Sequence, residues 1–135
     1  MVKVELSRII IDEKKHEQVI VLKEHQGLRL LPIVVGLSEA VAIRTFLSAI
    51  NPPRPLTHDL VKNIVQAMGA TLKEVIIDKL VENTFHAKLH LRICDGSTVT
   101  VDARPSDSIA LAVRFNAPIF VVEEIFERLA QGNEL

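Results

Sequence analysis

The sequence predicts an α+β fold in which helices pack on a mixed, mostly antiparallel sheet. Short segments that alternate apolar and polar residues, such as VKVEL at residues 2–6, have the two-residue period of strands. Other segments repeat their apolar residues every three or four positions, as amphipathic helices do. The order strand, strand, glycine turn, strand, helix occurs twice, about 68 residues apart, and SEAVAI at 38–43 lines up with SDSIAL at 106–111. This repetition suggests a duplicated β3α unit.

Each predicted strand follows from its apolar pattern and from the turn residues at its ends. Pro32 cannot donate a hydrogen bond to a sheet, so its strand is expected at an edge or at a bulge. Glycine-containing turns at residues 25–27 and 95–96 separate neighbouring strands. The predicted strands are residues 2–12, 17–24, 28–35, 72–81, 85–93, 97–103 and 118–122.

The helices are predicted from apolar stripes and from the residues at their ends. Ser38 and Thr57 are expected as N-caps, and Gly69 is expected to end the second helix. The helix at 106–115 is apolar nearly all round, so we expect it to be buried and to stop at Asn116. The stripes expected to face the core are Ala40, Ile43, Leu47 and Ile50 in the first helix and Leu60, Ile64 and Met68 in the second. The predicted helices are residues 38–50, 57–69, 106–115 and 123–132.

Length and composition favour a single domain, residues 1–135, in the cytoplasm. Cys94 is the only cysteine, which excludes an internal disulfide and a thiolate-rich zinc site. The start of the chain lacks the apolar core of a signal peptide, and no apolar run reaches the roughly 18 residues that span a bilayer. We therefore expect no membrane partner. The net charge of −1 and the aromatic content of 4% lower the expectation of a general nucleic-acid binder.

Two predicted helices begin after similar stretches, PRPLTHD at 53–59 and DARPSD at 102–107. In both, a hydroxyl side chain can cap the helix, and an acid in the first turn is favoured by the helix dipole. Capping does not explain Arg54 and Arg104, because a cation at a helix start opposes the dipole. Each arginine could pair with the neighbouring acid, or it could help to bind a phosphate at the helix start.

Two groups of histidines differ in their surroundings. His58 stands between Thr57 and Asp59 at a predicted helix start, where a nearby carboxylate would suit the imidazole to acid–base catalysis. An exposed first-turn histidine without a function is the alternative. His86 and His90 share the polar side of a strand and lie about 13 Å apart at 3.3 Å per residue, too far to share a metal ion. Their side of the sheet is expected to be solvated, or to be a surface that meets a phosphate backbone.

Four stretches follow one another along the chain: LPIVVGLSEAVAI, PPRPLTHDL, VDARPSDSIALAVR and APIFV. Together they strongly resemble the bifunctional nuclease (BFN) domain family, and the resemblance extends over residues 4–127. It implies a compact α+β domain, nuclease activity on DNA and RNA, and a homo-oligomer, with a dimer expected. The candidate site residues carried over by motif position are Glu39, Arg54, Thr57, His58, Asp59, Arg104, Ser106 and Asp107.

The roles expected of these residues follow from the needs of phosphodiester hydrolysis. A water must be activated, charge at phosphorus stabilised, and the leaving oxygen protonated or held by a metal. The expected catalytic residues are His58, Asp59 and Asp107, with His58 as base or acid. The residues expected to hold Mg²⁺ or Mn²⁺ are Asp59, Asp107 and Glu39. The expected phosphate ligands are Arg54, Arg104, Thr57 and Ser106.

This site requires three helix starts to converge in space. Two alternatives need no catalysis: a binding or assembly module, and a binder of a small phosphate-containing ligand.

Overall fold

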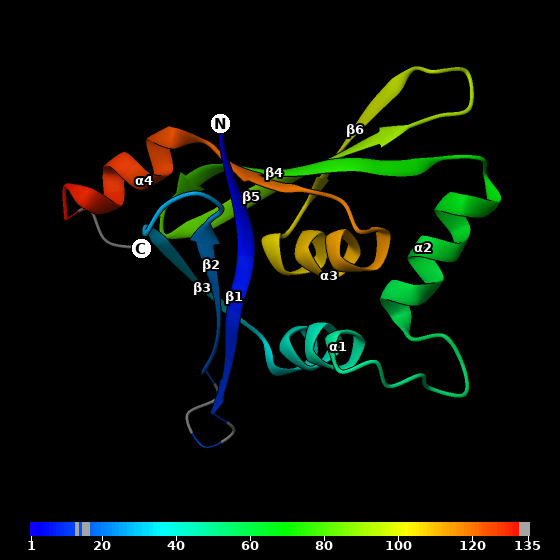
Figure 1. Cartoon of the computed structure of the whole chain (residues 1–135), viewed down its shortest axis with the longest axis horizontal. Helices are drawn as coiled ribbons and strands as arrows, with labels where there is room; N and C mark the ends of the chain where they lie inside the picture. Colours follow the sequence, from blue (N-terminus) through cyan, green and yellow to red (C-terminus); the bar gives the residue numbers. More distant parts are fainter. Residues whose placement is uncertain (13, 15–16, 133–135) are drawn as a thin grey trace.

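The fold is built on one seven-stranded sheet, shown in Figure 1. The computed structural model describes residues 1–12, 14 and 17–132. The strand order is β3-β2-β1-β7-β4-β5-β6, and each neighbouring pair is antiparallel except β4 and β7. The strands are β1 (Val2–Asp12), β2 (Glu17–Glu24), β3 (Leu30–Val35), β4 (Thr71–Val81), β5 (Thr84–Arg92), β6 (Thr98–Ala103) and β7 (Ile119–Val121). The predicted α+β fold with a mixed, mostly antiparallel sheet is confirmed.

Two three-stranded meanders make up most of this sheet. The first, β1–β2–β3, is followed by helix α1, and the second, β4–β5–β6, is followed by helix α3. Strand β7 lies between the meanders, antiparallel to β1 and parallel to β4. The order of elements therefore agrees with the duplicated β3α unit, and β7 joins the two copies into one sheet.

Proline and glycine lie where their backbone chemistry allows them. Pro32 lies in β3, which forms one edge of the sheet, where a residue without an N–H is tolerated. Gly96 has φ = 89° in the turn between β5 and β6, and Gly69 has φ = 76° just after the second helix. Both angles lie in the left-handed region that glycine adopts without strain. The edge, the turn and the helix end predicted from these residues are confirmed.

Helix α3 is the buried helix of the fold, as its apolar sequence predicts. It packs against α1, α2, β4 and β5, and it ends at Asn116, which has the left-handed φ of 53°. The buried residues of α3 are Pro105, Ser106, Ser108, Ile109, Ala110, Leu111, Ala112 and Arg114. The helices are α1 (Leu37–Leu47), α2 (Thr57–Ala67), α3 (Pro105–Phe115) and α4 (Glu123–Ala130). None of them is long and apolar enough to cross a membrane.

The hydroxyl side chains expected to cap helices do not do so. Ser38, Thr57 and Ser106 each lie inside the first turn, and no side chain of an N-cap residue makes a capping bond at α1, α2 or α3. At α3 the reason is proline, which is favoured at the first helical position and moves the cap one residue back. At α2 the carboxylate of Asp59 accepts the N–H of Leu56 at 3.0 Å. The residues at the N-cap positions are Gly36, Leu56 and Arg104.

Helix α2 exposes the apolar side that was predicted to be buried. Met68 is 75% exposed, and none of the residues of α2 is buried. The helix leads into the start of β4, at the right of Figure 1, and its contact with the core runs through its other side, where Val61 is partly buried. In α1 the prediction holds for Ala40 and Ile43, which are fully buried. The exposed members of the two predicted core stripes are Leu47, Ile50, Leu60, Ile64 and Met68.

Candidate functional site

The starts of α1, α2 and α3 meet around one open cavity of about 490 Å³, here called the His58 cavity. Helix α3 contacts both other helices, which brings the three starts together. Each helix start contributes unpaired backbone N–H groups and the positive end of its dipole. The residues around the cavity are Ser38, Glu39, Val41, Ala42, Leu56, Thr57, His58, Arg104 and Asp107. The convergence that the predicted site requires is thus present for Glu39, Thr57, His58, Arg104 and Asp107.

His58 and Asp107 form the polar centre of the His58 cavity. The ring nitrogen Nε2 of His58 lies 2.9 Å from Oδ1 of Asp107, although 49 residues separate them in the chain. The His58 side chain is 14% exposed and that of Asp107 is 30% exposed. A carboxylate in this position orients the imidazole. The pair has the arrangement of a general acid–base group.

Arg104 binds the same carboxylate from its other side. Its Nε donates to Oδ2 of Asp107 at 2.8 Å and its Nη2 donates to Oδ1 at 3.1 Å. Burial alone would raise the pKa of the Asp107 carboxyl, but the hydrogen bonds from Arg104 and His58 outweigh it and lower that pKa. The hydrogen bond to Asp107 and the charge of Asp107, and after them the charge of Glu39 3.5 Å away, raise the pKa of Arg104. The arginine side chain is still 66% exposed, so a further anion can reach it.

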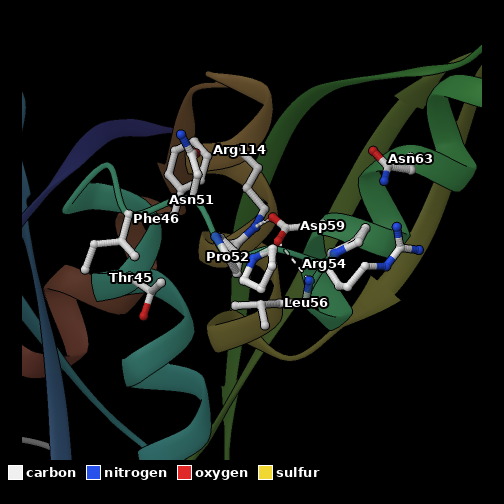
Figure 2. Close-up of a pocket in the computed structure, with 12 residues that line it drawn as sticks. Thr45, Phe46, Asn51, Pro52, Arg54, Leu56, Asp59, Asn63 and Arg114 are labelled. Atoms are coloured by element: carbon white, nitrogen blue, oxygen red, sulfur yellow. Dashed lines mark hydrogen bonds and ion pairs between the residues drawn. The ribbon is translucent and has the colours of Figure 1, made fainter.

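Asp59 lines a neighbouring cavity of about 290 Å³, here called the Arg54 cavity and shown in Figure 2. Its Oδ1 accepts a hydrogen bond from Nε of Arg114 at 2.7 Å, and its Oδ2 accepts the N–H of Leu56 at 3.0 Å. Burial would raise the pKa of Asp59, but these two bonds lower it. Both carboxylate oxygens are therefore engaged outside the His58 cavity.

Arg114 is a residue of this region that the sequence patterns missed. Its side chain is only 1% exposed. A buried charge needs partners, and an arginine directly after the apolar run IALAV of a helix predicted to be buried is the signal that could have marked it. Asp59 is one of those partners.

Two predicted phosphate ligands lie away from His58. Arg54 lies at the Arg54 cavity, is exposed, and has no hydrogen-bond or ion-pair partner within the described residues. Its loop is restricted by prolines, which fix their own backbone φ. Ser106 is buried and lines a different hollow, which it shares with Arg104. The prolines of the Arg54 loop are Pro52, Pro53 and Pro55.

The three carboxylates expected to hold a metal do not form one site. In the described part of the chain, no three His, Cys, Asp or Glu side chains are arranged to hold a metal ion. Asp107 is paired with Arg104 and Asp59 with Arg114, in different cavities. Since a shared Mg²⁺ or Mn²⁺ needs several free oxygen ligands, these acids do not fit one as they stand.

Two members of the polar stripe on β5, Lys88 and His90, have acidic partners within the sheet. His90 Nδ1 lies 2.8 Å from Oε2 of Glu74, and Lys88 Nζ donates to Oδ1 of Asp102 at 2.9 Å. A lysine that is already paired gains less from a phosphate backbone. This favours a solvated sheet face over a nucleic-acid surface.

Most of this chain is similar in sequence to known proteins. A family model described as the bifunctional nuclease domain matches residues 20–133. The chain is 45% identical to an uncharacterized protein of Mycobacterium tuberculosis over 127 residues, which is 94% of this chain and 73% of that protein.

Two plant proteins are similar as well. Bifunctional nuclease 2 of Arabidopsis thaliana is 36% identical over 105 residues, which is 76% of this chain and 32% of that protein. Bifunctional nuclease 1 of Oryza sativa subsp. indica is 29% identical over 126 residues, which is 92% of this chain and 37% of that protein. The chain spans about a third of each plant protein. With the whole His58 cavity inside the matched span, the chain belongs to the bifunctional nuclease domain family.

Proposed function

We propose that this protein is a nuclease that hydrolyses phosphodiester bonds of DNA and RNA in the His58 cavity. The observation that carries the proposal is the His58–Asp107 pair beside the exposed side chain of Arg104, where three helix starts meet. Membership of the bifunctional nuclease domain family supports the same activity.

The proposed chemistry uses the ring nitrogen that Asp107 does not engage. With Nε2 of His58 bonded to Asp107, Nδ1 is the nitrogen left to take a proton from water. Asp107 then stabilises the imidazolium that forms, and the imidazolium can return the proton to the leaving oxygen. Arg104 supplies positive charge for the oxygens on phosphorus, together with the helix starts.

The phosphate ligands divide between the two cavities. Thr57 and Arg104 line the His58 cavity and would hold the scissile phosphate. Arg54 would hold a neighbouring phosphate of the same strand, because it has no partner among the residues that the structure describes and lies at the adjoining cavity. Ser106 would need to change its surroundings to take part, since it is buried in another hollow.

Assistance by Mg²⁺ or Mn²⁺ stays a prediction. Asp59, Asp107 and Glu39 could bind an ion only after giving up arginine partners, so no step above is routed through a metal. Cleavage that EDTA abolishes and Mg²⁺ restores would establish that an ion takes part. Cleavage that is unchanged in EDTA would restrict the chemistry to the protein's own side chains.

A cleavage assay on single-stranded DNA and RNA tests the proposal. Wild type, His58→Ala and Asp107→Asn would be compared in Mg²⁺, Mn²⁺ and EDTA. General acid–base catalysis contributes about 10²–10⁴-fold, so we expect losses of that size in both variants. His86→Ala is the matched control, because His86 lies on the sheet face outside the cavity.

The outcomes separate the activity from its location. Equal cleavage by all proteins would point to a contaminant or to another site. Absence of cleavage by well-folded wild type, with every metal and both substrates, would reject the nuclease and favour a module that binds phosphate without hydrolysis.

An assembly role is favoured by a separate observation, the exposed apolar side of α2. Leu60, Ile64 and Met68 lie on it, each at least half exposed. We propose that a second copy of the chain covers this side, which gives the homo-oligomer, with a dimer expected. Light scattering should show a lower mass for Ile64→Glu than for wild type, and a monomeric wild type would reject this. The cytoplasmic location also stays a prediction.

A further inference from the structure

Arg114 connects the three helices that build the His58 cavity, as Figure 2 shows in part. Its Nε donates to Asp59 on α2 at 2.7 Å, and its Nη2 donates to the carbonyl of Ala42 on α1 at 3.2 Å. Its Nη1 donates to the carbonyl of Ala110 on α3 at 2.9 Å. The guanidinium also lies over the ring of Phe46, 5.1 Å from its centre. One buried side chain therefore holds α1, α2 and α3 together.

The first turn of α2 is held by α3 at two points. Asp107 and Arg114 lie seven residues apart on α3, which is two turns on the same side, or about 10.5 Å along the axis at 1.5 Å per residue. Their partners, His58 and Asp59, are consecutive in α2. A change at one contact must therefore move or rotate the residue that makes the other.

We propose that Arg114 is a positioning residue for His58: by holding Asp59, it fixes the first turn of α2 and keeps the imidazole against Asp107. The inference rests on the proposed nuclease function for its kinetic consequence only. Arg104 cannot replace it, because its ion-pair partners, Asp107 and Glu39, lie on α3 and α1 and not on α2.

Two conservative substitutions weaken this tie without emptying the core. Arg114→Lys keeps the charge, but an ammonium lacks the planar fork that reaches Asp59 and the Ala42 carbonyl together. Asp59→Asn keeps the shape of the side chain and removes its charge. Both act on one contact, so the double variant should be little worse than the more severe single variant.

The direct test is to measure the NMR signals of the His58 ring by ¹⁵N-edited spectra, at fixed pH in EDTA. The ring signals report the tautomer and the hydrogen bond, and His58→Ala assigns them. We expect both variants to move these signals toward their position in Asp107→Asn, while those of His86 stay in place. In cleavage, kcat should fall about 10- to 100-fold with KM within about twofold, because misplacing a catalytic group by about 1 Å can cost 10²-fold.

Arg29→Lys is the matched control, since it weakens an arginine–glutamate pair that does not involve α2. It should leave the His58 ring signals and kcat as in wild type. Unchanged His58 signals in folded Asp59→Asn and Arg114→Lys would overturn the inference, even with normal cleavage in wild type. Wild type without cleavage would reject the nuclease alone, because the NMR comparison still decides whether Arg114 positions His58. If Arg114→Lys does not fold, Asp59→Asn decides.

Discussion

Replacing Arg114 by methionine should destabilise the protein by about 3 kcal/mol. The substitution removes three hydrogen bonds of the guanidinium and leaves the Asp59 carboxylate without its cation. Breaking a buried ion pair by removing one partner costs about 3–5 kcal/mol. Asp59 is 28% exposed, so water replaces part of the lost interaction and the lower end of that range applies.

Urea denaturation at pH 7 measures this loss. The chain contains no Trp and no Tyr, so circular dichroism is the suitable signal. A double-mutant cycle with Asp59→Asn isolates the pair, and we expect a coupling of about 1.5–3 kcal/mol, the size of a hydrogen bond to a charged group. Arg29→Met is the control, because Arg29 is 39% exposed and exposed pairs contribute about 1 kcal/mol or less.

Two results would refute this reasoning. A loss below about 1 kcal/mol in Arg114→Met would mean that the buried contacts contribute no more than a surface pair. A coupling near zero would mean that Arg114 stabilises the protein without the Asp59 contact.

Three further predictions concern stability. The carboxyl pKa values of Asp59 and Asp107 are lowered in the folded state, so their stabilisation is complete above the unfolded value of about 3.9 and is lost as pH falls through the folded values. Acid unfolding should therefore be shallower in the double Asn variant, and an unchanged pH profile would contradict this. Ile43→Ala should lower the free energy of unfolding by about 2–5 kcal/mol because Ile43 is fully buried. Ile64→Ala, on the exposed side of α2, should lower it by under about 0.5 kcal/mol in the monomer. Urea denaturation measures both losses. Asn116→Val should cost about 1–2 kcal/mol in thermal unfolding, since φ is 53° there, and Asn116→Gly should be tolerated.

The repeated pattern of the sequence was sufficient to predict the sheet and the order of its elements along the chain. Alternation in the strands, the edge proline and the glycine turns depend on neighbouring residues, so a single sequence contains them. The helix starts were less predictable. The N-cap of α1 is Gly36 and not Ser38, a difference of two residues, and helix ends are defined only to within one or two residues.

The partners of the charged residues depended on contacts between distant segments. Local spacing offered Asp59 to Arg54 and Asp107 to Arg104, and only the second pair is present. Asp59 binds Arg114 instead, 55 residues away. Nothing in the local pattern of either residue specifies that contact.

The sequence alone determined the α+β class, the two β3α units, and the motif residues Glu39, Thr57, His58, Arg104 and Asp107 of the cavity. Those features follow from short-range periodicity and from motifs read along the chain. The tertiary structure decided which acids meet His58 and which side of α2 faces solvent. Both depend on how α1, α2 and α3 pack, because the sequence of a helix shows which residues share a side but not which of them contact another helix.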